Sequence, residues 1–268
     1  MAITKSRLLS LDIYPDVVSE ECRLWHRFSA NYKNGDLSNF IPNESESITW
    51  ENRINLYSPE NRVVYQPIMD RLCREMEIQD EVFSPVLSTF ANEQIKMTSM
   101  AIKFLSESDD CLDFALRSMV GRIVIVNCDE LVGCSSPLFL GLIIIAPKGN
   151  WTIYDYMENI IHEMSHIELY IKQIVDPLVI KGSYLKSPFR NQPRPASGVY
   201  HAAFVLARII KYFKPFAGKS QHTAVLKKRI DEWRLLLDET LSQFYNREIL
   251  TPAGQKIFNE MNAVVLRD

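Results

Sequence analysis

Apolar residues recur at helical spacing along most of the chain. Such stripes fall within residues 1–35, 60–105 and 221–265, where an apolar side chain returns every three or four positions. This period is typical of amphipathic helices that bury one face. Residues 36–60 are polar and rich in turn-forming residues instead. They predict a loop or hinge between an N-terminal arm and the rest of the chain.

The pattern changes in the middle of the chain. Residues 122–127 and 138–146 are rich in branched aliphatic side chains and are bounded by glycine and proline. Both runs are therefore predicted to be strands. The second run is almost continuously apolar, so we expect it to be buried on both faces. The predicted fold is a mainly helical α+β fold in which a small sheet packs against the helix that follows it.

That following helix carries a histidine motif. It is predicted to end near Ile174, and it contains His162, Glu163 and His166 in the pattern H-E-x-x-H. Because a helix turns every 3.6 residues, the two histidines project from one face, one turn apart. Two imidazoles in this arrangement can bind one metal ion. Glu163 points about 100° away around the helix, so we expect an acid/base or orienting role for it.

A third histidine lies beyond a predicted loop over residues 181–197. His201 is in an apolar helix, predicted from Ser197 or Gly198 to about Phe213, where an unpaired imidazole would be unfavourable. His201 is therefore the expected third metal ligand. Gly198, one turn earlier, leaves room for another backbone or a substrate to come close.

The chemistry depends on the metal. With zinc, a bound water would be the nucleophile and Glu163 its general base, as in a peptidase. With iron(II), open positions would accept an α-keto acid and dioxygen. The far carboxylate of such a cosubstrate needs a cation, and arginine suits it because its planar fork matches a carboxylate. The candidates are Arg208 first, then Arg194, then Arg190, while Glu168 is expected on the surface.

Composition narrows the classes of partner. The 268 residues have a formal net charge of −3, so nothing favours a nucleic-acid or membrane-surface partner. The five cysteines are scattered without a C-x-x-C spacing, which indicates reduced thiols. The first residues lack the apolar core of a signal peptide, and the run over 138–145 is too short to span a bilayer. We therefore expect a cytoplasmic protein.

The two histidine segments together resemble one family. The first segment is Ile160-Ile161-His162-Glu163-x-x-His166 followed by Asp176-Pro177-Leu178, and the second is Arg194-Pro195-x-x-Gly198-Val199-x-His201-x-x-Phe204-Val205-x-Ala207-Arg208. The chain is similar here to the HExxH-type α-ketoglutarate-dependent peptide β-hydroxylases, which modify ribosomally synthesised peptides. The resemblance covers roughly residues 120–215, and its second segment is much more specific than H-E-x-x-H.

The resemblance implies an enzyme with non-haem iron(II), 2-oxoglutarate and dioxygen that hydroxylates a side-chain β-carbon of a precursor peptide. Residues 111–268 would then form the metal-binding catalytic core, and the N-terminal helical region, residues 1–110, would be the place for peptide recognition. Two other classes stay open. They are an H-E-x-x-H zinc metallopeptidase and a metal-free binding protein that has kept an old site.

Overall fold

The computed structural model describes residues 4–32, 37–43, 49–78, 82–188, 190–218, 223–245 and 248–266. The chain divides into two compact units. We call Cys22–Ile167 the sheet unit, and Met1–Glu21 together with Glu168–Asp268 the helical unit. The division falls within two helices, α2 (Pro15–Asn31) and α7 (Ile153–Val175).

The sheet unit contains a four-stranded sheet with the strand order β1–β2–β4–β3. The strands are β1 (Ile54–Leu56), β2 (Arg122–Ile125), β3 (Gly133–Cys134) and β4 (Leu142–Ile145). Strand β2 runs parallel to both β1 and β4, whereas the edge strand β3 is antiparallel to β4. The two strands predicted over residues 122–127 and 138–146 are thus confirmed. They are shorter than predicted, partly because Pro137–Phe139 forms a 3-10 turn.

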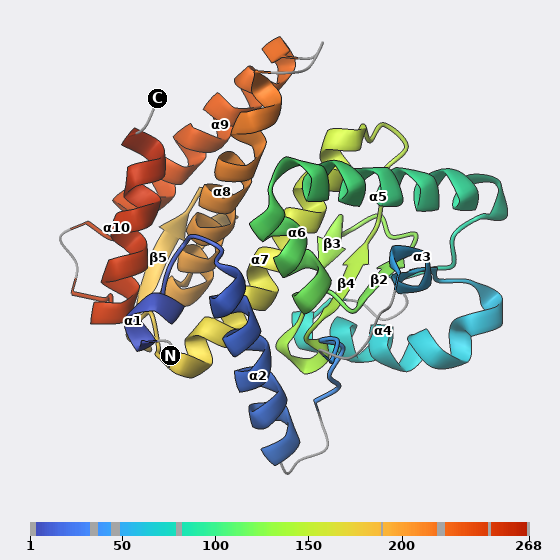
Figure 1. Cartoon of the computed structure of the whole chain (residues 1–268), viewed down its shortest axis with the longest axis horizontal. Coiled ribbons are helices and arrows are strands. Elements are labelled where there is room, and N and C mark those ends of the chain that lie inside the picture. Colours follow the sequence, from blue (N-terminus) through green and yellow to red (C-terminus); the bar gives the residue numbers. More distant parts are fainter. Residues whose placement is uncertain are drawn as a thin grey trace. The chain divides into compact units, whose positions relative to one another are not determined.

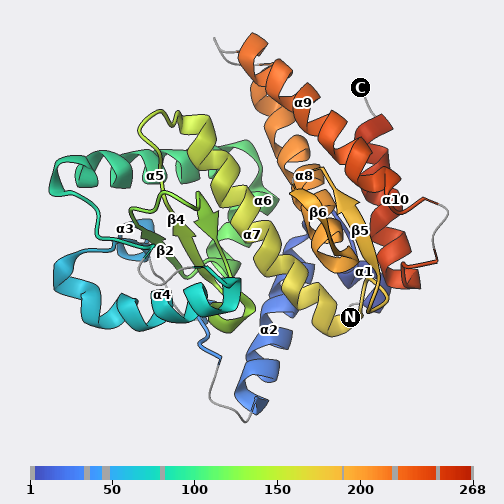
Figure 2. The same ribbon diagram turned by 180° about the vertical axis from the view of Figure 1, so that it is seen from behind.

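Burial on both faces explains why β2 and β4 are so apolar. Val124 and Ile144 point into a core that they share with α4 (Arg62–Met76), and the alternate residues of both strands are buried on the other face. The sheet lies between α4 and the pair α5 (Ser88–Ser108) and α6 (Asp110–Met119) in both ribbon views (Figures 1 and 2). The prediction that the 138–146 run is buried on both faces is confirmed.

The histidine helix α7 contacts the sheet at its edge strand β3. A Cβ atom at Gly133 would lie 2.1 Å from Oδ1 of Asn159 and 3.1 Å from Oε1 of Glu163. A side chain at this position would therefore require Asn159 to shift. The expected packing of this helix against the sheet is confirmed at this contact.

The helical unit is built around the long helix α8, most of whose residues are buried. Its helices α8, α9 and α10 lie side by side, and the hairpin of β5 and β6 also contacts α8 (Figure 1). Their bounds are α8 (Ala196–Ala217), α9 (Thr223–Ser242), α10 (Pro252–Leu266), β5 (Tyr184–Ser187) and β6 (Arg190–Pro195). The remaining short elements of the chain are α1 (Lys5–Leu8), α3 (Trp50–Arg53) and a 3-10 turn at Pro59–Asn61.

Three sequence predictions differ from the structure. The loop predicted over residues 181–197 is the β5–β6 hairpin, whose prolines are tolerated because a two-stranded hairpin leaves N–H positions unpaired. The loop predicted over 36–60 contains α3 and β1, and β1 is too short to show a pattern. The C-terminal helical stripe over 221–265 is two helices, because the chain turns between α9 and α10.

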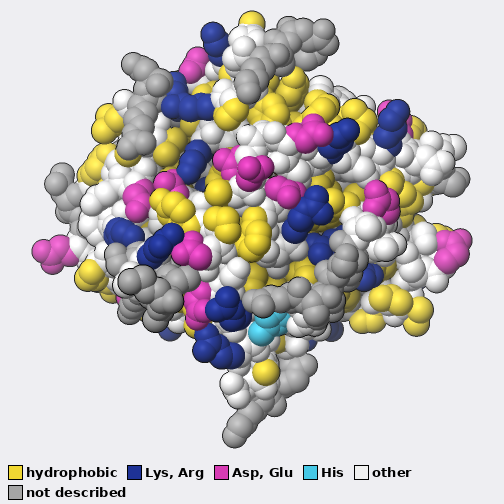
Figure 3. All heavy atoms as spheres, viewed as in Figure 1, with side chains coloured by type: hydrophobic (Ala, Val, Ile, Leu, Met, Phe, Trp, Pro, Cys, Tyr) yellow, Lys and Arg dark blue, Asp and Glu magenta, His cyan; other side chains and the backbone are white. Residues whose placement is uncertain are grey.

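The face seen in Figure 3 carries positive and negative side chains interspersed with apolar ones. Among the described residues, no helix is both long and apolar enough to cross a membrane. The predicted division of the chain after residue 110 falls at the start of α6, which packs against α5 within the sheet unit. The assignment of different functions to residues 1–110 and 111–268 stays a prediction.

Candidate functional site

The histidine pair lies on α7 in the sheet unit. This helix begins beside Thr152, whose backbone N–H and hydroxyl both donate to Oδ2 of Asp155 at 2.6 Å. His162 and His166 follow one turn apart, and their Nε2 atoms are 3.2 Å from each other. Both rings are partly exposed, whereas the residues between them are buried.

The geometry of the pair fits a single metal ion. A point about 2.1 Å from each Nε2, the usual metal–imidazole distance, would subtend an angle of about 100° between the two nitrogens. This angle lies between the octahedral and tetrahedral values. Burial lowers the pKa of His162 to about 4, so its imidazole is neutral and has a lone pair to donate. The donor set therefore suits iron(II) or zinc equally well.

No third candidate ligand stands beside His162 and His166 among the described residues. In the part of the chain that the structure covers, no group of three or more His, Cys, Asp or Glu side chains is gathered closely enough to hold a metal ion. The third ligand, expected at His201, stays a prediction.

Glu163 is directed toward the edge of the sheet. It is buried, and Oγ of Ser135 donates to its Oε2 at 2.7 Å. Burial raises the pKa of Glu163 to about 7, while the hydrogen bond from Ser135 acts in the opposite direction. A carboxyl group with this pKa can hold or release a proton near neutral pH. The Ser135 contact was not predicted, because nothing in the sequence indicates which loop meets Glu163.

His201 lies on α8 in the helical unit. The side-chain amide of Gln173 donates to its Nε2, and its ring packs against Tyr170 with ring centroids 5.3 Å apart. Burial, and to a smaller extent the Arg194 cation, lower the pKa of His201 to about 4. His201 is therefore neutral, but binding a metal through Nε2 would require Gln173 to move away.

Arg194 is the side chain nearest to Gly198. A Cβ atom at Gly198 would lie 3.6 Å from Nη2 of Arg194, an ordinary van der Waals distance. The close approach of a backbone or a substrate expected at Gly198 stays a prediction. Arg194 is partly exposed, so a ligand from solvent can reach it. The side chain of Arg190 lies outside the described part of the structure.

Arg208 is fully buried in an ion-pair network of the helical unit. Its Nη2 lies 2.6 Å from Oε1 of Glu168, and Nζ of Lys172 lies 2.9 Å from the same oxygen. Lys172 also pairs with Glu21 at 2.6 Å. Glu168, predicted on the surface, is only 1% exposed. That prediction is wrong because two buried cations neutralise the carboxylate.

Part of this network is unsatisfied. Within the described residues, Nε and Nη1 of Arg208 have no hydrogen-bond partner, and neither have Oε2 of Glu168 and Oε2 of Glu21. Glu168 and Lys172 are four residues apart on α7, so helical spacing could have indicated their pairing. Glu21 lies about 150 residues away in the chain, and no sequence signal links it to them.

Comparison with known proteins adds no constraint on this site. Neither a family model nor a curated protein matches the chain. Any assignment of function therefore depends on the geometry of α7 and on the residue patterns of the two histidine segments.

Proposed function

We propose that the chain is an iron(II)- and 2-oxoglutarate-dependent dioxygenase that hydroxylates a side-chain β-carbon of a ribosomally made precursor peptide. The observation that carries this proposal is the pair of partly exposed imidazoles of His162 and His166, with Nε2 atoms 3.2 Å apart. The resemblance of residues 120–215 to the peptide β-hydroxylases supports iron(II) and 2-oxoglutarate over other metals and cosubstrates.

In this proposal His162 and His166 hold the metal, and His201 is the third ligand. When bound, iron(II) would supply the activation of dioxygen, coupled to the oxidative decarboxylation of 2-oxoglutarate, with one oxygen atom going to the peptide. Glu163 stays behind the ligands, fixed by Ser135, and holds a proton at its carboxyl group. Through this hydrogen bond Glu163 would orient α7 against the sheet edge, and its carboxyl group can hold or release a proton near neutral pH.

The distal carboxylate of 2-oxoglutarate requires a cation, and the contacts favour Arg194 over Arg208. The Nη2 atom of Arg208 already binds Glu168, and the whole side chain is 0% exposed. A dicarboxylate would have to displace Glu168, or reach the two unpartnered nitrogens of Arg208 through packed protein. Arg194 is partly exposed and its cation lies close enough to lower the pKa of His201.

The alternative is an H-E-x-x-H zinc metallopeptidase. It is favoured by the pKa of Glu163, which burial raises to about 7, because a general base works best with a pKa near the working pH. Against it stands the direction of the Glu163 carboxylate, which is bonded to Ser135 at the sheet edge.

Anaerobic addition of iron(II) and 2-oxoglutarate distinguishes the proposed oxygenase from a zinc metallopeptidase. The oxygenase should develop a weak visible charge-transfer band. The His162→Ala variant should lose the band, and His26→Ala should keep it, because His26 hydrogen-bonds to Asn39 elsewhere in the sheet unit. If the band fails to form while zinc supports peptide hydrolysis without oxygen, the metallopeptidase is the better account.

A further inference from the structure

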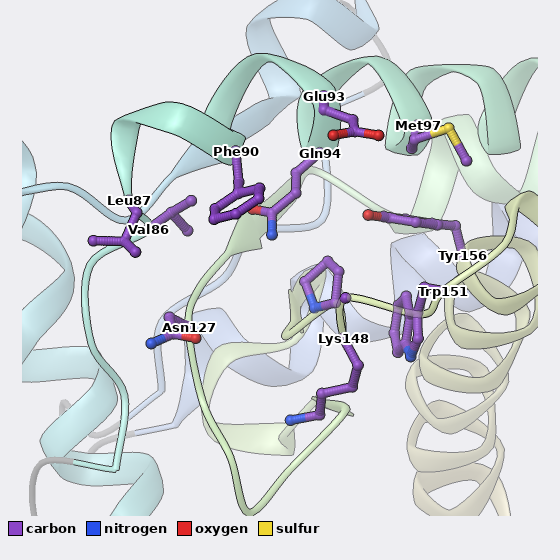
Figure 4. A pocket seen from close by; sticks show the side chains of 12 residues that line it. Val86, Leu87, Phe90, Glu93, Gln94, Met97, Asn127, Lys148, Trp151 and Tyr156 are labelled. Atoms are coloured by element: carbon purple, nitrogen blue, oxygen red, sulfur yellow. The ribbon is translucent and has the colours of Figure 1, made fainter.

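A pocket of about 300 Å³ opens in the sheet unit, apart from the histidine pair. It lies at the carboxyl ends of the parallel strands β2 and β4, where the loops that follow them meet the first turns of α5 and α7 (Figure 4). Sheets with parallel strands commonly bind ligands at this edge. The metal histidines are not among the residues that line it.

Three aromatic rings surround the pocket. Phe90 comes from α5, Trp151 from the loop after β4 and Tyr156 from α7 (Figure 4). The rings of Trp151 and Tyr156 meet edge to face, with centroids 5.1 Å apart. Tyr156 is only 4% exposed and forms a wall, whereas Phe90 is 54% exposed and forms part of the rim. Such faces attract a cation as well as apolar groups.

Helix α5 contributes two polar side chains to the pocket, the carboxylate of Glu93 and the amide of Gln94, which can both accept and donate hydrogen bonds. Oε1 of Gln94 is buried and has no hydrogen-bond partner within the described residues. Glu93 is exposed at the rim, and among the described residues it makes no ion pair. After burial, the Glu93 charge is the next largest cause that raises the pKa of Tyr156, to about 12, so the carboxylate lies near the ring hydroxyl. The pocket thus presents the carboxylate of Glu93 and, among the described residues, one buried amide oxygen without a donor.

The one cation among the described lining residues is directed elsewhere. Nζ of Lys148 donates to the backbone carbonyls of Cys128 and Leu131, the latter at 2.8 Å, and it points away from the rings (Figure 4). The first turn of α7 already contains the carboxylate of Asp155. Glu93, on the second turn of α5, places a further carboxylate at the rim of the pocket, and this charge favours a cationic ligand.

We propose that this pocket binds a protonated amine on an alkyl chain, namely the lysine side chain of a peptide. The alkyl chain would pack against Trp151 and Phe90, and the ammonium would lie between the ring faces, Glu93 and Gln94 Oε1. The volume is at the lower end for ligand pockets and suits one side chain rather than a cofactor. The site does not depend on the proposed oxygenase activity, because it involves none of the metal residues.

Ligand-observed NMR or calorimetry of the full chain, without added metal, tests this directly. The probe is N-α-acetyl-lysine methylamide, and the matched probe is N-α-acetyl-norleucine methylamide, which keeps an alkyl chain and lacks the charge. We expect the lysine probe to bind about tenfold more tightly, in the range of a desolvated cation–aromatic contact. Equal binding of the two probes, or preferential binding of acetate or inorganic phosphate, would overturn the proposal.

Variants locate the binding. Glu93→Gln and Trp151→Leu should each weaken binding of the lysine probe by about three- to tenfold while thermal unfolding stays that of the parent. Glu107→Gln is the control, because it removes the same charge from an exposed position of the same helix. An affinity unchanged by both pocket variants would place the probe elsewhere and refute the assignment. Because no metal is present, failure here would leave the proposed oxygenase activity untouched.

Discussion

Helix α7 carries two polar clusters with opposite character. His162 and His166 are both partly exposed, and their Nε2 atoms lie 3.2 Å apart. The imidazole of His162 is neutral because burial lowers its pKa to about 4. Glu168 and Lys172 are fully buried and pair with Arg208 and with the N-terminal part of α2. The first cluster is a pair of imidazoles in which His162 has no charged partner among the described residues, whereas the charges of the second cluster are paired within the protein. The difference shows that a charged residue near a candidate site need not be part of it.

The same comparison separates the two arginines. By sequence spacing, Arg208 is the better partner for a cosubstrate carboxylate, because it follows His201 by two turns of α8. In the structure its charge is matched by Glu168, and the side chain is inaccessible. Arg194 has the exposure that Arg208 lacks. Burial, rather than helical register, thus separates the two arginines.

The largest effect should come from removing the central cation of the buried network. Lys172→Met leaves Glu21 and Glu168 buried without their shared partner, and loss of one partner of a buried pair destabilises by about 3–5 kcal/mol. Urea unfolding measures this change. The control is Lys103→Met, whose exposed pair with Glu107 should contribute less than about 1 kcal/mol. Equal losses of unfolding free energy in the two variants would mean that water screens the charges of the buried network.

The histidine pair should behave in the opposite way. His162→Ala should lower the affinity for iron(II) by about 100-fold or more, since loss of even an outer contact of a metal site costs 10- to 100-fold. The free energy of unfolding without metal should hardly change, because the ring is partly exposed. Competition with a chromophoric chelator under anaerobic conditions measures the affinity. His26→Ala serves as the control, and parent-like iron binding by His162→Ala would remove α7 as the metal helix.

The two arginine variants sharpen the comparison within the helical unit. Arg194→Ala should raise the 2-oxoglutarate concentration needed for half-maximal turnover by about tenfold or more, because a carboxylate loses a charge-assisted, two-pronged contact. Arg208→Ala should chiefly destabilise the fold, and Arg208→Lys should recover stability only in part. If Arg208→Lys keeps the stability of the parent but its turnover no longer responds to 2-oxoglutarate, Arg208 rather than Arg194 binds the cosubstrate.

Much of the fold was predictable because burial leaves a pattern in the sequence. The runs of β2 and β4 are apolar throughout because both faces are covered, so their strands could be recognised. β1 has three residues and pairs with β2 from about 70 positions away, which no local pattern reveals. The hairpin over residues 184–195 was missed because its prolines resemble those of a loop.

The candidate site was predictable only where residues are neighbours in sequence. The spacing of His162 and His166 fixes their shared face, since one helix carries both. The contacts of Glu163 with Ser135 and of Lys172 with Glu21 join distant segments. A buried Glu168 was unexpected because its neutralising partner Arg208 comes from another helix. Charges are rarely buried alone, so such burial becomes predictable only once the partner is known.

The smallest effect we predict is a pH dependence set by Glu21. Burial raises the pKa of this carboxyl group from 4.5 to about 7, while the cation of Lys172 acts in the opposite direction. A folded state with the higher pKa binds the proton more tightly than the unfolded state. The contribution of Glu21 to stability is therefore fully present below about pH 4.5, declines as the pH rises toward 7, and is lost above that value.

Glu21→Gln should remove this dependence, because an amide stays neutral at every pH. Urea unfolding gives the free energy of unfolding of each protein at pH 5.5 and at pH 7.5. The change in this free energy between the two pH values should differ by roughly 1–2 kcal/mol between parent and variant, at 1.36 kcal/mol per pKa unit. Other buried groups, such as Glu163, titrate in both proteins and cancel in this comparison. Glu20→Gln removes the same charge one residue earlier, where the side chain is partly exposed, and should leave the parent's pH difference in place. If Glu21→Gln keeps that difference too, Glu21 is already ionised at pH 5.5, and the buried network is a fully charged set of two ion pairs.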